Sequence, residues 1–342
     1  MKNDLEQFSS AYHQIHSYIA ILLCVFGVLG NSLNIFILTR KTMISTMNIL
    51  LTALAVFDGL KSAVHLPYII VIYYIHAVSH SPTGKARYIM FYAIVAMVFH
   101  TASIWLTVSL AIFRYIAVKF PLRGVTLCSK YRAKLTIFIV CVAAVGVCLP
   151  NSLSYSYVRH DKNDTSNETS WVVLMRFEMG DYTFVQRLNM WILIFIVRLL
   201  PSFLLLVLSI LLIQELRGAA KSRSKLTGQC NSEKDEIIER RTETNRTTGM
   251  LVVVVVLFIV IELPHGILLL LMTISSEFWN FDIYISIYES LGDLIDDITL
   301  LNNGINFVIY CSMSKKFRDT FMEMFSCSNA KSKYTPTGIR NI

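Results

Sequence analysis

The sequence predicts an all-α integral membrane protein, a bundle of seven transmembrane helices followed by a short amphipathic helix at the inner membrane surface. Three observations support this. The 342 residues are 54% hydrophobic with a mean hydropathy of +0.55. Charged residues make up only 16%, whereas soluble domains contain about 25%. Seven apolar segments each exceed the ~20 residues that a helix needs to cross about 30 Å of hydrocarbon.

The predicted membrane domain covers residues 15–311. An outer tail precedes it at 1–14, an amphipathic helix follows at 312–325, and a cytoplasmic tail ends the chain at 326–342. Polar or charged loops separate the apolar segments, which is why we place the membrane boundaries there. The predicted spans are residues 15–39, 47–74, 87–118, 131–153, 188–216, 247–274 and 285–311.

The distribution of basic residues predicts the orientation of the chain. Of the 31 lysines and arginines, 21 lie in the loops and tail that we assign to the cytoplasm. Because basic loops stay on the cytoplasmic side, the N-terminus is predicted outside and the C-terminus inside. The basic residues flank spans and do not gather on one folded face, so nucleic acid is not an expected partner. Membrane lipids are an expected partner, because Lys315, Lys316 and Arg318 of the amphipathic helix can meet lipid phosphates.

The beginning of the chain shows no cleavable signal peptide. The first 14 residues are polar, and no short apolar core with a cleavage site follows them. The first span is therefore expected to act as an uncleaved anchor.

The seven cysteines predict no disulfide. Three lie inside spans and four on the predicted inner side, so none falls in an outer segment, where disulfides form. Cys327, just after the amphipathic helix, is a candidate for lipidation. The cysteines are Cys24, Cys141 and Cys148 in spans, and Cys128, Cys230, Cys311 and Cys327 on the inner side.

The long loop between the fourth and fifth spans contains two acceptor triplets for N-linked sugar, at Asn163 and Asn167. Because this loop is predicted to be extracellular, we expect both asparagines to be glycosylated. A third triplet, at Asn245, falls on the predicted cytoplasmic side and is expected to stay unmodified.

The last span has a continuous polar face. Its polar residues recur every three or four positions, which places them on one side of a helix. In lipid, acids on one side of a helix must face a protein bundle or a wet interior. The residues of this face are Glu289, Asp293, Asp296, Thr299, Asn303, Asn306 and Tyr310.

Charged residues in other spans also need partners inside the bundle. Asp58 and Lys61 lie three residues apart in the second span, so they can pair. Glu262 lies two residues before Pro264 in the sixth span, beside the backbone break that proline introduces. Arg198 lies in the fifth span.

No enzyme signature stands out. The sequence lacks a glycine-rich nucleotide loop, a zinc-spaced cysteine and histidine set, and a catalytic serine–histidine–aspartate pattern, so we predict that the chain is not an enzyme. A transporter or channel that uses the acidic face as an ion path is an alternative, but the halves of the chain show no internal repeat of the kind common in transporters.

Short motifs in the expected spans resemble those of rhodopsin-class G-protein-coupled receptors, and the resemblance covers nearly the whole chain. Longer stretches, such as ELPHGI and GDLIDDITLLNNGINFVIYCSMSKKFR, are similar to invertebrate, especially nematode-type, myosuppressin and FMRFamide-type neuropeptide receptors. The short motifs are Gly30-Asn31, Leu54-Ala55-Val56-Phe57-Asp58, Phe113-Arg114-Tyr115, Phe258 followed by Ile261-Glu262-Leu263-Pro264, and Asn306-Phe307-Val308-Ile309-Tyr310.

The chain departs from the pattern of that class at several positions. Phe113 replaces the acid before the arginine, Glu262 replaces a tryptophan, and Phe307 replaces a proline. The usual outer cysteine pair and the fourth-span tryptophan are also missing. Because the missing acid normally helps to hold the inactive state, some basal signalling is expected.

The resemblance implies a plasma-membrane receptor that binds a peptide ending in Arg-Phe-amide outside and a heterotrimeric G protein inside, with arrestin as a further partner. The outer acids need a cation. Lys61 and Arg198 supply part of this positive charge, and an arginine of the ligand supplies the rest. In the alternative, the acids form a hydrated vestibule that only steers cations. The ligand-binding residues so implied are Glu262, Glu289, Asp293, Asp296, Asp297, His100 and His265.

The resemblance also implies a coupling machinery. Arg114 and Tyr115 are expected at the G-protein contact, with a switch formed by Phe258, Glu262, Pro264, Asn306 and Tyr310. Asp58, Ser103 and Asn303 correspond to an allosteric sodium site, and no other metal or cofactor is implied; the alternative is a structural hydrogen-bonded cluster with Lys61 as its cation. A chemosensory receptor for small molecules on the same fold is the alternative function.

Overall fold

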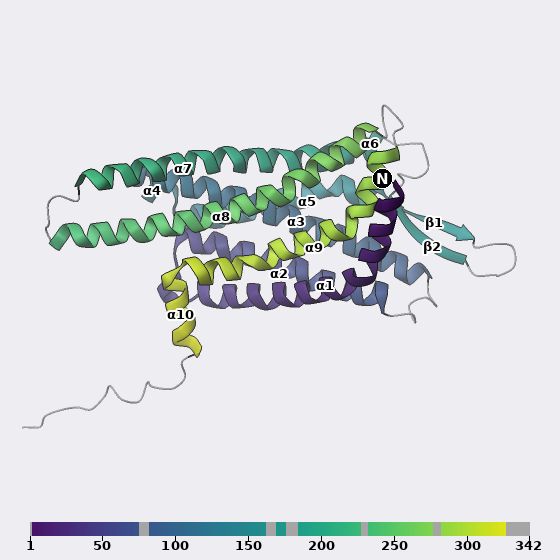
Figure 1. Ribbon diagram of the computed structural model, residues 1–342, viewed down its shortest axis with the longest axis horizontal. Helices are drawn as coiled ribbons and strands as arrows, with labels where there is room; N and C mark the ends of the chain where they lie inside the picture. Colours follow the sequence, from purple (N-terminus) through teal and green to yellow (C-terminus); the bar gives the residue numbers. More distant parts are fainter. Residues whose placement is uncertain are drawn as a thin grey trace, which may run out of the picture.

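The computed structural model describes residues 2–74, 82–161, 169–175, 184–226, 232–275 and 282–325. Figure 1 shows an elongated bundle in which long helices run side by side. The long helices are α1 (Lys2–Leu38), α2 (Thr46–Tyr73), α3 (Pro82–Lys119), α5 (Lys130–Ser154), α7 (Leu200–Leu226), α8 (Ser232–Ile274) and α9 (Asp282–Met313), and the short elements are η1 (Lys41–Met43), α4 (Pro121–Leu127), α6 (Phe184–Ile192), η4 (Leu193–Leu199) and α10 (Lys315–Phe325).

Six described segments are long and apolar enough to cross a membrane, within α1, α2, α3, α5, the fifth span and α8. The seventh predicted span corresponds to α9, which has 32 residues and whose acids lower its hydropathy. At 1.5 Å per residue this helix is about 48 Å long, ample for a bilayer. Large apolar side chains such as Leu22, Phe138 and Val260 are 63–70% exposed on the outside of the bundle, as lipid contact requires.

Two helices extend beyond the spans predicted for them. α1 begins at Lys2, so the described residues of the predicted outer tail are helical and continue the first span. α8 begins at Ser232, within the charged segment between the fifth and sixth spans. The positions of the membrane boundaries along these helices stay predictions.

The loop after α5 contains an antiparallel hairpin of β1 (Tyr155–Asp161) and β2 (Thr169–Met175), in which Tyr155 lies opposite Met175. The sequence predicts only a long loop here, without strands. The candidate glycosylation sites Asn163 and Asn167 lie outside the described residues, as does the candidate lipidation site Cys327.

The fifth span is not a uniform helix. A π-helical turn, η4, separates α6 from α7 and contains Arg198 near its end. The Ser202 hydroxyl, one turn further on, donates to the backbone oxygen of Arg198 at 2.8 Å. Such turns shift the direction of the side chains that follow them, and this one positions Arg198 toward the bundle interior.

The amphipathic helix α10 is held to the bundle by aromatic packing. Phe317 is 1% exposed, and its ring centroid lies 5.7 Å from that of Tyr310 and 6.2 Å from that of Phe307. Figure 1 shows α10 turning away from the direction of α9 at the end of the bundle.

Candidate functional site

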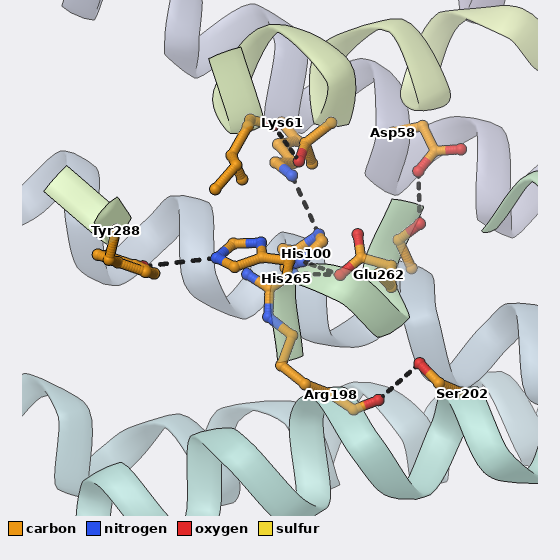
Figure 2. Close-up of polar contacts among 11 residues, drawn as sticks. Asp58, Lys61, His100, Arg198, Ser202, Glu262, His265 and Tyr288 are labelled. Carbon is orange, nitrogen blue, oxygen red and sulfur yellow. Dashed lines mark hydrogen bonds and ion pairs between the residues drawn. The ribbon is translucent and has the colours of Figure 1, made fainter. Parts of the chain in front are cut away.

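The centre of the bundle contains a network of charged and histidine side chains from four helical segments (Figure 2). Arg198 on η4 forms an ion pair with Glu262 on α8, whose side chain is 1% exposed. His100 Nε2 on α3 lies 3.6 Å from Glu262 Oε2, and its Nδ1 lies 3.0 Å from Lys61 Nζ on α2. Because a buried charge is costly without a partner, the pair explains how Glu262 and Arg198 occupy apolar spans.

Lys61 does not pair with Asp58 as the sequence spacing suggested. Three residues of helix turn by about 300°, which leaves the two side chains about 60° apart, and each contacts a different part of the bundle. Lys61 points to His100. Asp58 accepts hydrogen bonds from the Ser103 hydroxyl on α3 and, at 3.0 Å, from the Asn306 amide on α9.

The predicted sodium-site residues lie in this second cluster. Asp58 and Ser103 are in contact, and the backbone oxygen of Asn303 accepts from Asn31 Nδ2 at 2.9 Å. The Asn303 side chain has no hydrogen bond to Asp58 among the described residues. The Asp58 carboxylate and the Ser103 hydroxyl are oxygen ligands of the kind that a hard cation prefers. The sodium site stays a prediction.

Two acids of the polar face of α9 are paired with residues of α1 that sequence analysis did not consider. His13 Nδ1 lies 2.8 Å from Asp293 Oδ2, and His16 Nδ1 lies 3.2 Å from Asp297 Oδ2. The Tyr12 hydroxyl donates to Asp297 at 2.7 Å. Tyr12, His13 and His16 have the spacing of residues on one side of a helix. The sequence nevertheless predicted a polar tail here, because no run of apolar residues accompanies them.

Asp296 differs from its neighbours. Its side chain is exposed although it lies deep among the helices, in the electrostatic field of Lys61, His16 and Arg198. These residues belong to three other segments of the bundle, so Asp296 faces inward. Among the described residues it has no hydrogen-bond or ion-pair partner, unlike the other predicted ligand-binding acids whose side chains are described. The Glu289 side chain lies outside the described part.

The predicted pocket histidines have internal partners. His265 Nε2 on α8 lies 3.4 Å from the Tyr288 hydroxyl on α9 (Figure 2). His100 belongs to the central network already described. The histidines thus link neighbouring helices.

Of the predicted coupling and switch residues, Glu262 and Pro264 lie near the central network, and Arg114, Tyr115 and Tyr310 lie toward the inner ends of α3 and α9. Arg114 on α3 is 7% exposed and Tyr310 on α9 is 2% exposed. Lys119 donates to the Tyr115 hydroxyl at 2.7 Å and lies 3.6 Å from Glu215 on α7, so it joins two helices. Pro264 lies within α8, and the Phe258 side chain is outside the described residues.

Comparison with known proteins agrees with the helical membrane fold. The family model described as "Serpentine type 7TM GPCR chemoreceptor Srw" matches residues 18–328. The chain is 31% identical to the G-protein coupled receptor dmsr-1 of Caenorhabditis elegans, over 92% of this chain and 68% of the relative. It is 29% identical to the sex peptide receptor of Drosophila melanogaster, over 91% and 72%, and 28% identical to the FMRFamide receptor of the same organism, over 88% and 52%.

The family match covers most of the chain and confirms the predicted fold class, the resemblance and the prediction that the chain is not an enzyme. A multi-pass membrane location follows from the same match. The chain therefore belongs to the Srw family of serpentine seven-transmembrane G-protein-coupled receptors.

Proposed function

We propose that this receptor binds a peptide ending in Arg-Phe-amide at the outer half of the bundle and transmits the binding to a heterotrimeric G protein. The observation that carries the proposal is Asp296, an inward-facing, solvent-accessible acid with no hydrogen-bond or ion-pair partner among the described residues. A ligand arginine is the natural partner, since its planar guanidinium pairs with a carboxylate through two parallel hydrogen bonds.

The pairing of the surrounding acids supports this assignment. Asp293, Asp297 and Glu262 already contact histidine, tyrosine or arginine side chains. A ligand that displaced these partners would leave buried charges unpaired, at a cost of several kcal/mol. Asp296 requires no such exchange. His265 and Tyr288, which lie together on α8 and α9, offer an aromatic surface for the terminal phenylalanine ring.

The names of the relatives support a peptide ligand. One relative is named for FMRFamide and another for a sex peptide, and both are similar to this chain along most of its length. The plasma membrane, with the N-terminus outside, is the location that such a ligand requires, and the excess of basic residues in the predicted inner loops favours this orientation.

The proposed mechanism is a population shift between two arrangements of the bundle. Arg198 and Glu262 join the fifth and sixth spans through one ion pair, so a cation bound at Asp296 changes the field on the pair. A peptide that favours one arrangement shifts the equilibrium by its difference in affinity for the two. The inner ends of α7 and α8 then separate, and the G protein binds beside Arg114, with arrestin as a later partner.

The experiment is a G-protein activation assay on cells that express the chain, screened with Arg-Phe-amide peptides and their free-acid forms. Asp296→Asn is expected to raise the half-maximal peptide concentration about 10- to 100-fold, the usual effect of losing a charged hydrogen bond. Glu6→Gln, which removes an exposed acid from the outer end of α1, is the matched control and should leave potency unchanged. A panel without any response, at verified surface expression, contradicts the proposal.

A second candidate function is supported by the family description, which names a chemoreceptor. On this alternative, the ligand is a small cationic molecule that pairs with Asp296. A response to small amines together with silence to every amidated peptide identifies it.

A further inference from the structure

A cavity of about 660 Å³ lies between the end of α1 and the second half of α10, at the end of the bundle predicted to face the cytoplasm. It is far from the central network and none of the functions above uses it. Its lining residues come from α1, the turn that follows it and α10: Phe36, Arg40, Lys41, Thr42, Thr320, Glu323 and Met324.

Two cations, Arg40 and Lys41, face this cavity. Within the described part of the chain, neither Arg40 nor Lys41 has a carboxylate within 4.0 Å. The Arg40 guanidinium lies over the Phe36 ring, 4.2 Å from its centroid, which orients it while leaving its N–H groups available. Two adjacent cations repel each other unless an anion lies between them.

The other polar groups leave the cavity net positive. Glu323 contributes one carboxylate against two cations. The Thr42 side chain is exposed, with no hydrogen bond among the described residues, so its hydroxyl is available as a donor. The Thr320 hydroxyl donates to the backbone oxygen of Lys316 at 2.9 Å and retains only acceptor capacity. The two cations and the Thr42 hydroxyl are donors of the kind that suit an anion with several oxygens, such as a phosphate ester.

The apolar part of the lining favours an amphiphilic ligand. Phe36, near the end of α1, is 50% exposed, and Met324 lies on α10. α10 is the helix predicted to lie at the inner membrane surface, and it packs against α9 through Phe317, so the cavity is expected where hydrocarbon meets the headgroups. Anionic phospholipids are enriched in the cytoplasmic leaflet, and basic pockets at this level bind their headgroups.

We propose that this cavity is a binding site for the phosphorylated headgroup of an anionic phospholipid of the inner leaflet. Arg40 and Lys41 pair with the phosphate, and Phe36 and Met324 contact the first part of the acyl chains. The inference goes beyond the receptor's signalling role and does not depend on which ligand the outer half binds.

The test is a titration of the purified full-length receptor in detergent with dioctanoyl phosphatidylinositol bisphosphate, followed by the melting temperature. Dioctanoyl phosphatidylcholine controls for the acyl chains, and soluble inositol trisphosphate controls for the headgroup alone. The test variant is Arg40→Gln/Lys41→Gln. The control variant, Lys130→Gln/Arg132→Gln, removes one lysine and one arginine from exposed positions at the start of α5 that do not line the cavity.

The wild-type receptor should show a saturable rise in melting temperature with the anionic lipid and none with phosphatidylcholine. Arg40→Gln/Lys41→Gln should weaken the apparent affinity at least about tenfold, while the control variant stays close to wild type. Glu323→Gln should tighten binding, since it removes the carboxylate that opposes the phosphate. An equal loss in both double variants, or an equal response to inositol trisphosphate, would overturn the lipid site. The melting-temperature measurement uses no peptide and no G protein. A negative result therefore counts against the lipid site without bearing on the proposed receptor function.

Discussion

Arg198 and Glu262 form an ion pair across the bundle, between the π-helical turn of the fifth span and the sixth-span helix α8. Glu262 stands where the motif of rhodopsin-class receptors has a tryptophan, and Arg198 reaches it from the π-helical turn η4. The pair therefore replaces an apolar switch residue with a charged contact between the two spans whose inner ends are proposed to move.

This pair should contribute strongly to stability. Glu262→Gln leaves Arg198 without its carboxylate and is expected to cost about 3–5 kcal/mol, seen as a large fall in melting temperature of the detergent-solubilised receptor. Arg198→Met/Glu262→Met, which removes both charges, should be more stable than the single variant. Glu215→Gln serves as control, because its exposed pair with Lys119 is worth at most about 1 kcal/mol. Equal melting of Glu262→Gln and Glu215→Gln would show that the pair is not buried as described.

The contact between Tyr12 and Asp297 should hold the outer part of α1 against α9. Tyr12→Phe removes a hydroxyl that donates to a carboxylate only 4% exposed, so a loss of about 1–3 kcal/mol is expected. Tyr18→Phe is the matched control, because Tyr18 is 62% exposed and has no hydrogen bond among the described residues. Proteolysis of the first residues should accelerate in Tyr12→Phe alone; identical rates in the two variants contradict the contact.

The separation of Lys61 from Asp58 predicts how sodium acts. Because Asp58 contacts Ser103 and Asn306 rather than Lys61, Lys61→Met should leave any sodium-dependent stabilisation intact, whereas Asp58→Asn should abolish it. The measurement is the melting temperature in sodium chloride against N-methylglucamine chloride at equal ionic strength. Loss of the sodium response in Lys61→Met would show that the two residues act as one site.

The residue before Arg114 predicts basal signalling. Phe113 cannot restrain Arg114 through an ion pair as an acid does, so the receptor without ligand should signal above cells carrying an empty vector. Phe113→Asp is expected to lower that basal level at equal surface expression. Phe113→Asn introduces a side chain of the size of aspartate without its charge, and should lower the basal level less. Basal signalling equal to that of the vector control would contradict the idea that the missing acid before Arg114 permits signalling without ligand.

Helix positions in the spans follow from long apolar runs, because hydrophobic segments of such length have few alternatives in a bilayer. The partners of the charged side chains could not be predicted from the sequence in the same way. Lys61 and Asp58 are neighbours in sequence, but their choice of partner depends on which of several surrounding helices each one faces. That depends on packing, which spacing along one helix does not determine.

The outer end of the bundle shows a second reason. The polar residues Tyr12, His13 and His16 carry no hydrophobic pattern, so the helix that contains them was predicted as a tail. Their partners, Asp293 and Asp297, lie about 280 residues further along the chain, and no local rule links such distant positions. Asp296 was included among the candidate ligand contacts, but its distinction from Asp293 and Asp297 required knowledge of what already occupies those two.

The pairing of Asp296 with a ligand arginine is the central claim, and a double-mutant cycle tests it most directly. G-protein activation is measured for the wild-type receptor and Asp296→Asn, each with an Arg-Phe-amide peptide and with the same peptide carrying citrulline in place of arginine. If Asp296 pairs with the ligand arginine, either change alone raises the half-maximal peptide concentration about 10- to 100-fold. The second change, made on top of the first, then adds little. If the two losses multiply instead, arginine and Asp296 act independently, and the ligand's cation binds elsewhere.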